Sequence, residues 1–306
     1  MTSIRPTRLV VLGSILVDLV LDIPALPDRG GDVLAHEVGY HPGGGFNIAS
    51  AAARLGLATA YGGPYGTGPM ADRVLAALAG EGIPVLQHPD PTRDTGYCIT
   101  LVDAGGERTF VTVTGADGDV DPAELASLQY EAGDVVYVSG YDLAYPTSGP
   151  VLADHVRRLA SVTDGGPIVV VDPSPLAADT PDDVWAAVLP RAQVLTCNAR
   201  EFDVMQPVLR RHPSDCVVIR RDGSSGAQIH RLGQPPVTAP GYPVRPVDTN
   251  GAGDVHVGAM IAGLADGLDL PDSVDLANRA AAMSVTRRGG ASGPTRAELL
   301  DRCSDL

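Results

Sequence analysis

The sequence predicts a three-layer α/β fold in which helices cover both faces of a mainly parallel central sheet, with a small β-sheet lid outside it. Short runs rich in β-branched residues alternate with Ala-rich helical stretches. Continuous apolar strands of this kind are typical of parallel sheets buried on both faces. The predicted strands are 9–12, 135–138, 168–171, 194–196 and 217–219, and the predicted helices include 48–55, 71–79, 149–159 and 184–187.

Two segments, approximately 15–41 and 94–114, break this rhythm because apolar and polar residues alternate in them. Residues 95–103 and 107–113 flank the turn Ala104-Gly105-Gly106 and predict a β-hairpin. We expect the two segments to pair as a small antiparallel sheet. Such an exposed sheet is a candidate lid and, where one face is apolar, a candidate homodimer surface.

The composition excludes several kinds of protein. The 306 residues are 44% hydrophobic, which is enough for a sizeable core. Acidic residues outnumber basic ones by 37 to 22, and the net charge of −15 argues against nucleic-acid or anionic-membrane partners. All 22 basic residues are Arg. Without Lys the chain cannot carry a Walker A lysine, a protein-kinase strand lysine or a Schiff-base lysine.

The cysteines predict a cytoplasmic protein. Cys98, Cys197, Cys216 and Cys303 are far apart and form no Cys-x-x-Cys motif or Cys/His cluster, which is typical of a reducing compartment. Asp18 interrupts the apolar stretch 9–23, so a first strand explains that stretch better than a signal peptide. No apolar run approaches the ~20 residues of a membrane span.

A glycine-rich loop near the N-terminus is the first candidate binding element. Gly43, Gly44 and Gly45 permit positive φ and a close approach of the backbone to a ligand. Asn47 either caps the helix that follows or hydrogen-bonds a hydroxyl-bearing ligand. Asp18 follows the first strand, where its carboxylate would bind two sugar hydroxyls or cap a turn.

A second glycine-rich element, Asp-Thr-Asn-Gly-Ala-Gly-Asp at 248–254, carries the strongest signal. The small residues 251–253 expose consecutive N–H groups at the start of a helix, which makes an anion hole. Asp254 lies in the first turn of that helix, and we expect it to take the proton of an attacking hydroxyl rather than only to cap the helix. For His256 we expect a buried structural or substrate-adjacent role rather than that of a base or metal ligand.

Four motifs together carry a family resemblance. Residues 43–47 and 248–254 resemble the two signatures of the ribokinase/PfkB carbohydrate kinase family. Residues 198–201 (Asn-Ala-Arg-Glu) are similar to its Asn-x-x-Glu motif, and 220–226 resemble its nucleotide-binding strand and turn. The resemblance covers residues 9 to about 296. Residues 106–110 and 138–142 look most like those of little-characterised bacterial sugar kinases.

The resemblance implies one ribokinase-like domain over residues 1–306, and ATP-dependent phosphorylation of a hydroxymethyl group of a sugar. It assigns the general base to Asp254 and the anion hole to Gly251, Ala252 and Gly253. It assigns sugar binding to Asp18, Gly43, Gly44 and Asn47, and cofactor binding to Asn198, Glu201, Gly223 and Gly226. Glu201 would act on Mg²⁺ through water. Asp248 and Asn250 are candidate ligands of a monovalent cation such as K⁺.

The chain departs from the family pattern at two positions. Gly45 stands where many relatives carry Lys, so the sequence does not identify ribose as the acceptor. Asn250 replaces the second Thr of the usual Asp-Thr-Thr-Gly and preserves its hydrogen bonding.

Other functions stay open. A nucleoside kinase, pseudouridine kinase included, would stack a base on aromatic rings near the predicted lid, namely Tyr40, Phe46, Tyr97, Phe110 and Tyr141. A sugar-phosphate kinase would use Arg29, Arg93 or Arg108. A non-catalytic sugar- or nucleotide-binding protein would be expected to have lost Asp254 or the Gly-Ala-Gly. A dinucleotide-binding oxidoreductase should show Gly-x-Gly-x-x-Gly after the first strand, which this chain lacks.

Overall fold

The computed structural model describes residues 5–301. Its central sheet has the strand order β12-β11-β10-β9-β8-β7-β1-β4. The strands from β4 to β10 pair in parallel, whereas β11 and β12 add an antiparallel edge. The mainly parallel sheet predicted from the apolar runs is therefore confirmed. These strands are β1 (Arg8–Val11), β4 (Ala58–Tyr61), β7 (Asp134–Ser139), β8 (Ile168–Asp172), β9 (Ala192–Asn198), β10 (Val217–Arg221), β11 (Gly226–His230) and β12 (Val237–Pro240).

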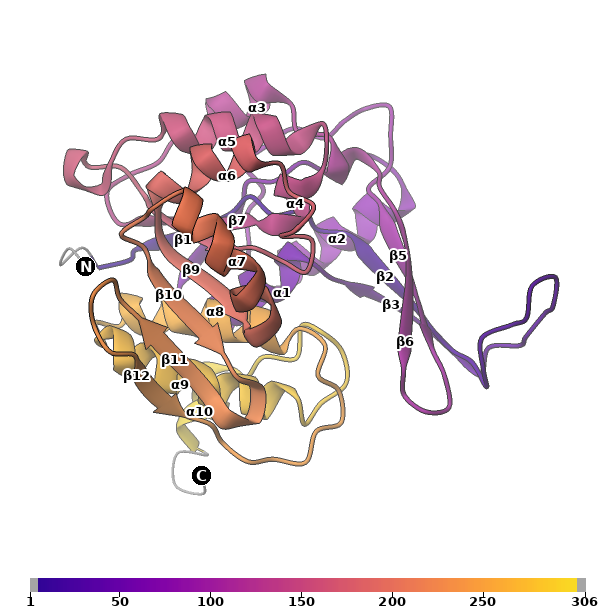
Figure 1. Ribbon diagram of the computed structural model, residues 1–306. Helices are drawn as coiled ribbons and strands as arrows, with labels where there is room; N and C mark the ends of the chain where they lie inside the picture. Colours follow the sequence, from indigo (N-terminus) through magenta and orange to yellow (C-terminus); the bar gives the residue numbers. More distant parts are fainter. Residues whose placement is uncertain (1–4, 302–306) are drawn as a thin grey trace.

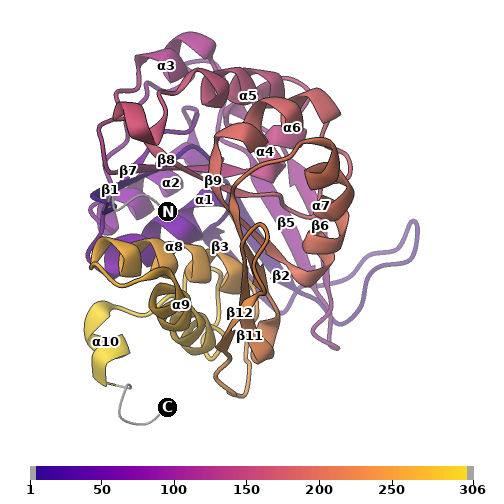
Figure 2. The same ribbon diagram turned by 60° about the vertical axis from the view of Figure 1, so that its left-hand side comes forward.

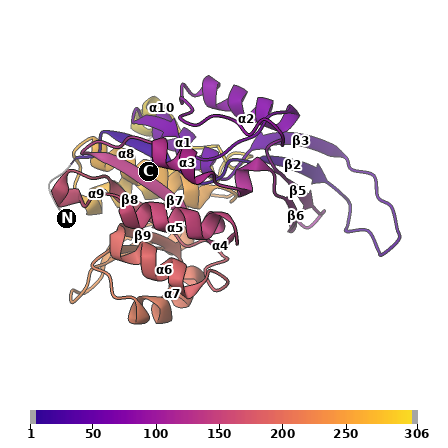
Figure 3. The same ribbon diagram turned by 90° about the horizontal axis from the view of Figure 1, so that it is seen from above.

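Helices cover both faces of this sheet (Figure 3). Along β1, Leu9 and Val11 pack into a core with α1, α8 and α9. Val10, and Leu12 just after the strand, pack into a second core with α5, α6 and α7. The alternation of side chains along a strand produces these two cores. The helices are α1 (Gly45–Arg54), α2 (Pro69–Gly80), α3 (Pro122–Ser127), α4 (Gly140–Ala144), α5 (Ser148–Arg158), α6 (Asp182–Val188), α7 (Ala199–Arg211), α8 (Ala252–Ala265), α9 (Leu270–Ser284) and α10 (Arg296–Asp301).

The lid is a second sheet of four strands that projects from one end of the main body (Figures 1 and 2). Its strands are β2 (Val17–Asp22), β3 (Glu37–Pro42), β5 (Tyr97–Val102) and β6 (Arg108–Val113), in the order β3-β2-β5-β6. The pairing is antiparallel within each segment, as expected, but β2 and β5 pair in parallel. Both strands leave the main body in the same direction, so the junction between the segments differs from the antiparallel pairing expected.

The carboxyl ends of the parallel strands gather the polar loops at one edge of the sheet. The strands β8, β9 and β10 end at Asp172, Asn198 and Arg221, and β1 leads through Gly13 into the lid. This edge is where open α/β sheets bind ligands.

Among the described residues 5–301, Cys98, Cys197 and Cys216 are buried free thiols, and Cys303 lies outside that range. In the same part of the chain, no helix is long and apolar enough to cross a membrane.

Candidate active site

Asp254 and Asn47 join the two glycine-rich elements. Asp254 is the third residue of α8, and its Oδ2 accepts a hydrogen bond of 2.9 Å from Asn47 Nδ2. Asn47 is the third residue of α1, whose N-cap is Gly44, so the capping role considered for Asn47 is wrong. The packing of α1 against α8 brings together two side chains 207 positions apart in the sequence.

The turn before α8 requires glycine at position 251. Gly251 has φ 70°, and a Cβ there would lie 2.1 Å from the carbonyl oxygen of Gly290. This turn starts the helix at Ala252, and the first N–H groups of a helix have no partner within it. The predicted anion hole over 251–254 therefore coincides with an actual helix start.

The surroundings of Asp254 favour its protonated form. Burial raises the pKa of Asp254 to about 7, and the carboxylates of Asp172 and Asp18 raise it too, while Asn47 and Arg221 act in the opposite direction. A carboxyl with a pKa in this range can exchange a proton at physiological pH.

Asp18 lies against the N-terminal glycine loop. A Cβ on Gly43 would lie 2.4 Å from Asp18 Oδ2, so only glycine leaves room for this carboxylate. Gly44 has φ 60°, and Gly45 N–H donates to the carbonyl oxygen of Ser14. Burial raises the pKa of Asp18 to about 6. The loop thus holds Asp18 at the base of the lid.

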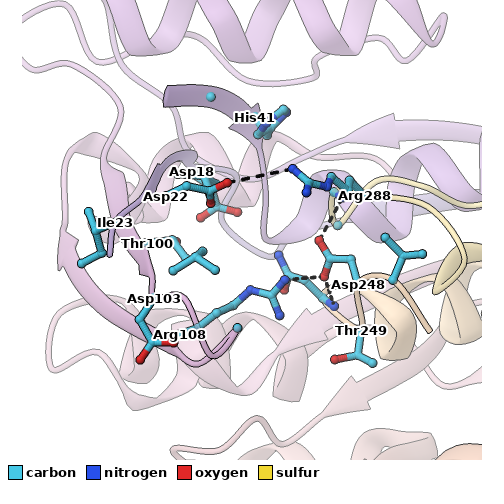
Figure 4. Close-up of a pocket in the computed structure, with 18 of the residues that line it drawn as sticks. Asp18, Asp22, Ile23, His41, Thr100, Asp103, Arg108, Asp248, Thr249 and Arg288 are labelled. Atoms are coloured by element: carbon cyan, nitrogen blue, oxygen red, sulfur yellow. Dashed lines mark hydrogen bonds and ion pairs between the residues drawn. The ribbon is translucent and has the colours of Figure 1, made fainter. Parts of the chain in front are cut away.

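A cavity of about 940 Å³ lies between the lid and the main domain (Figure 4). The lid contributes Asp18, Asp22, His41, Thr100 and Arg108 to its lining, and the main domain contributes Asp248, Thr249, Asn250 and Arg288. None of the lining residues is Phe, Tyr or Trp. The polar lining suits a ligand rich in hydroxyl groups.

Two ion pairs cross this cavity. Arg108 of β6 donates to Asp248 Oδ1 at 2.6 Å, and Arg288 lies 4.0 Å from Asp22 of β2. The Asp248 carboxylate also accepts the N–H groups of Asn250 (2.8 Å) and Gly289 (3.0 Å). Three N–H donors thus contact the oxygens of Asp248, and its role as a cation ligand stays a prediction.

The Asn-x-x-Glu motif at 198–201 forms a helix cap. Asn198 Oδ1 accepts from Glu201 N–H, and Glu201 Oε2 accepts from Asn198 N–H, at the start of α7. Between β10 and β11, Gly223 and Gly226 have φ 60° and 95°, and a Cβ on Gly226 would lie 2.2 Å from Ala239 O. The backbone of this turn therefore favours glycine at both positions, and its part in nucleotide binding stays a prediction.

A partly buried ion pair beside these motifs was not predicted from the sequence. Both terminal nitrogens of Arg221 donate to Asp172 Oδ2 at 2.9 Å. The sequence did carry a signal for it: Arg220 and Arg221 end an apolar strand. Because successive side chains of a strand point to opposite faces, one of the two arginines had to point into the domain. Arg220 turns the other way, pairs with Asp222 and lies over the ring of Phe202.

His256 lies between α8 and α9, where its Nε2 is 3.2 Å from Asn278 Oδ1. Burial, with a smaller effect of Arg221, lowers the pKa of His256 to about 3. A neutral imidazole buried at a helix contact agrees with the structural role expected for it.

The arginines considered for a phosphorylated acceptor separate into two groups. Arg108 lines the cavity, whereas Arg29 and Arg93 do not. Arg93 pairs with Asp90 and Asp119 instead.

These features belong together in enzymes that move phosphoryl groups: a helix start whose first N–H groups have no partner within the helix, a carboxyl with a pKa of about 7, and a polar cavity under a lid. A family model described as pfkB family carbohydrate kinase matches residues 6–297. The chain therefore belongs to the pfkB family of carbohydrate kinases, and it is a kinase of sugars or nucleosides.

Curated relatives and solved structures agree with this assignment. The chain is 32% identical to "Uncharacterized sugar kinase YegV" of Escherichia coli, over 95% of this chain and 92% of the relative. It is 31% identical to a ribokinase of Bacillus subtilis, over 94% and 97%. An Arabidopsis thaliana ribokinase, solved in complex with ribose and ATP, shares the fold with a TM-score of 0.76 at 20% identity, over 97% and 98% of the two chains.

Proposed function

We propose that this kinase transfers the γ-phosphate of ATP to a hydroxymethyl group of a sugar. The observation that carries the proposal is Asp254, a carboxyl with a pKa of about 7 in the first turn of α8, where backbone N–H groups can hold an anion. The structural relative solved with ribose and ATP supports the choice of both substrates.

In the proposed mechanism Asp254 accepts the proton of the acceptor hydroxyl as its oxygen attacks the γ-phosphorus and the bond to the ADP oxygen breaks. The amides of Gly251, Ala252, Gly253 and Asp254 stabilise the charge on the phosphoryl oxygens. Asn47 holds the Asp254 carboxylate in position through the 2.9 Å hydrogen bond. Closure of the lid over the cavity excludes water.

The two substrates would bind on opposite sides of Asp254. The sugar contacts Asp18, Gly43, Gly44 and Asn47, and the nucleotide contacts Asn198, Glu201, Gly223 and Gly226. Two carboxylates, Asp172 and Glu201, lie beside one guanidinium, that of Arg221. The excess of carboxylate oxygens over cationic groups fits Mg²⁺. Bound Mg²⁺ would offset phosphate charge, with Glu201 holding it through water.

The cavity lining favours a sugar over a nucleoside. Stacking a base needs an aromatic ring, and no Phe, Tyr or Trp is among the residues that line the cavity. Phe110 lies on the same face of the lid as Thr100, outside that lining. A phosphorylated sugar is disfavoured because Arg108 already pairs with Asp248.

A coupled assay of ADP release over a panel of sugars, nucleosides and sugar phosphates tests this function. We expect turnover with an unphosphorylated sugar that has a free hydroxymethyl group. Turnover with nucleosides only would replace the sugar by a nucleoside acceptor. Tight binding of a panel member without any turnover would identify a non-catalytic binding protein.

We further propose that a second copy of this chain covers the outer face of the lid. Leu19, Tyr40, Ile99 and Val111 lie side by side on that face, opposite the cavity. Tyr40 and Val111 are 45% and 51% exposed. Arg73 of α2 lies over the Tyr40 ring at one end of this row. An exposed apolar row of this kind marks an interaction surface, and a two-fold axis would pair it with itself.

We place the enzyme in the cytoplasm. The cysteines among the described residues are free and buried, which is typical of a reducing compartment, and ATP is available there. Fractionation of cells with an antibody against the chain tests the placement, and recovery outside the soluble fraction would contradict it.

A further inference from the structure

A cluster of partly buried charged side chains lies at the carboxyl ends of β8, β9 and β10. Arg221 stands at its centre, where one terminal nitrogen donates to both Asp172 Oδ2 and Thr196 Oγ1, at 2.9 and 2.8 Å. The other terminal nitrogen donates to Asp172 and lies 3.6 Å from Glu201 Oε2. These contacts hold the guanidinium group in one orientation.

The same guanidinium lies against the start of α8. A Cβ built on Gly253 would lie 3.4 Å from Arg221 Cζ, an ordinary van der Waals contact, so the guanidinium lies beside the first turn of α8. Arg221 also acts on Asp254, since its charge opposes the effect of burial on that carboxyl. Side-chain burial is incomplete, with 13% of the Arg221 side chain exposed.

We propose that Arg221 is a further residue of the anion hole, whose guanidinium, held by Asp172 and Thr196 against Gly253, contacts the phosphoryl group during transfer. The inference rests on the proposed function and deepens it. A chain without Lys has Arg as its only permanently charged cation. A guanidinium also presents several N–H donors at once, which suits the oxygens of a phosphoryl group.

The alternative is that Arg221 only neutralises Asp172. The balance of charge argues against this reading. Asp172, Glu201 and Asp254 place three carboxyl groups around one guanidinium, so the cluster stays acidic even with Arg221 in place. An approaching triphosphate needs every positive charge there, and Arg221 is the one that borders Gly253.

The first experiment compares Arg221→Gln with Arg8→Gln. Arg8 makes a similar two-nitrogen pair with Asp134, at 3.0 and 2.5 Å, but at the amino ends of β1 and β7. We expect Arg221→Gln to lower kcat about 10²-fold, the scale of one lost anion-hole donor. Arg8→Gln should leave kcat within about threefold of wild type.

Calorimetric titration gives a second readout that a merely structural role would not move. Arg221→Gln should weaken binding of adenylyl imidodiphosphate, which keeps a γ-phosphoryl group, about tenfold, the scale of a charged hydrogen bond. Binding of ADP should change by less than about threefold. Equal weakening of both nucleotides, or an unchanged kcat, overturns the proposal.

Two further variants separate contact from neutralisation and guard against misfolding. Asp172→Asn keeps the guanidinium, and the double variant Arg221→Gln, Asp172→Asn leaves no unpaired buried charge behind. We expect the double variant to stay as slow as Arg221→Gln, and Asp172→Asn to stay within about tenfold of wild type. Recovery of the double variant to wild-type turnover, or equal losses in it and in Asp172→Asn, overturns the proposal. Arg221→Lys should regain part of the loss, because it restores the charge without the planar fork.

The binding experiment also keeps the two proposals apart. If the wild-type protein phosphorylates no acceptor, the proposed function fails, yet the comparison of adenylyl imidodiphosphate with ADP still tests Arg221.

Discussion

The two sheets of this molecule expose their faces differently. Helices bury both faces of the main sheet, and its polar groups collect at the carboxyl edge, where Asp172, Arg221 and Asn198 are all partnered. The lid sheet has one face toward the cavity and one apolar face toward solvent. The main sheet thus holds the groups proposed for chemistry, and in the proposed function the lid would add closure, acceptor contacts and a surface for a partner.

Replacing Asp254 is the most direct test of the proposal that the main sheet holds the chemistry. We expect Asp254→Asn to lower kcat by at least about 10²-fold, since a general base is lost. Because burial raises the pKa of Asp254, its ionised form destabilises the folded state, and this cost grows as pH rises from the unfolded value toward about 7. The variant should therefore keep or raise the melting temperature at pH 8. Wild-type turnover in Asp254→Asn would contradict the assignment of the base.

Asp18 tests the lid's share of acceptor binding. Asp18→Asn should raise KM for the acceptor roughly 10–100-fold, the scale of hydrogen bonds to a charged group, and leave KM for ATP nearly unchanged. Asp22→Asn is the matched control, because Asp22 lies on the same face of β2 further from the loop of Gly43. Equal effects of both variants would show that Asp18 has no special role.

The pH dependence sharpens the same contrast. Asp254 must be ionised to accept a proton, and its pKa is about 7, so kcat should fall about tenfold between pH 8 and pH 6. Rates measured at saturating substrate across this range check the expectation. A flat profile down to pH 5 would show that a group with an ordinary carboxyl pKa, or none, limits the reaction.

Arg108 provides the contact between the lid and the loop before α8. Arg108→Gln removes the ion pair with Asp248 and should lower kcat/KM for the acceptor no more than about fivefold, since a partly exposed pair contributes up to ~1 kcal/mol. Arg93→Gln breaks pairs with Asp90 and Asp119 outside the cavity and should have no effect on kcat/KM. If turnover of Arg108→Gln is faster in K⁺ than in Na⁺ while wild-type turnover is not, the Arg108 guanidinium occupies the place of a monovalent cation beside Asp248.

The outer face of the lid should affect turnover least. Val111→Asp places a charge in the apolar row and should shift the molecular mass measured by light scattering from dimer to monomer, with kcat changed less than about twofold. Thr109→Asp, at the edge of the same face, is a milder control. A wild-type protein that is already monomeric would contradict the proposed dimer.

Much of the fold and part of the site could be predicted from the residues in order. The apolar runs predicted β1, β7, β8, β9 and β10, and the alternating segments predicted the lid. The small residues at 251–253 predicted a helix start, and Ala252 begins α8. The parallel pairing of β2 with β5 could not be predicted from the sequence, because the direction of each lid strand depends on where it leaves the main body.

Local pattern thus determined which segments become strands, which loops need glycine, and that phosphate must be handled here without lysine. Only the tertiary structure decided which side chains meet: Asn47 with Asp254, Arg108 with Asp248, and Arg221 with Asp172. The physical reason is distance along the chain. Backbone conformation and periodicity act over a few residues, whereas these contacts join positions separated by between 49 and 207 residues, and packing of helices and strands alone brings them within hydrogen-bonding range.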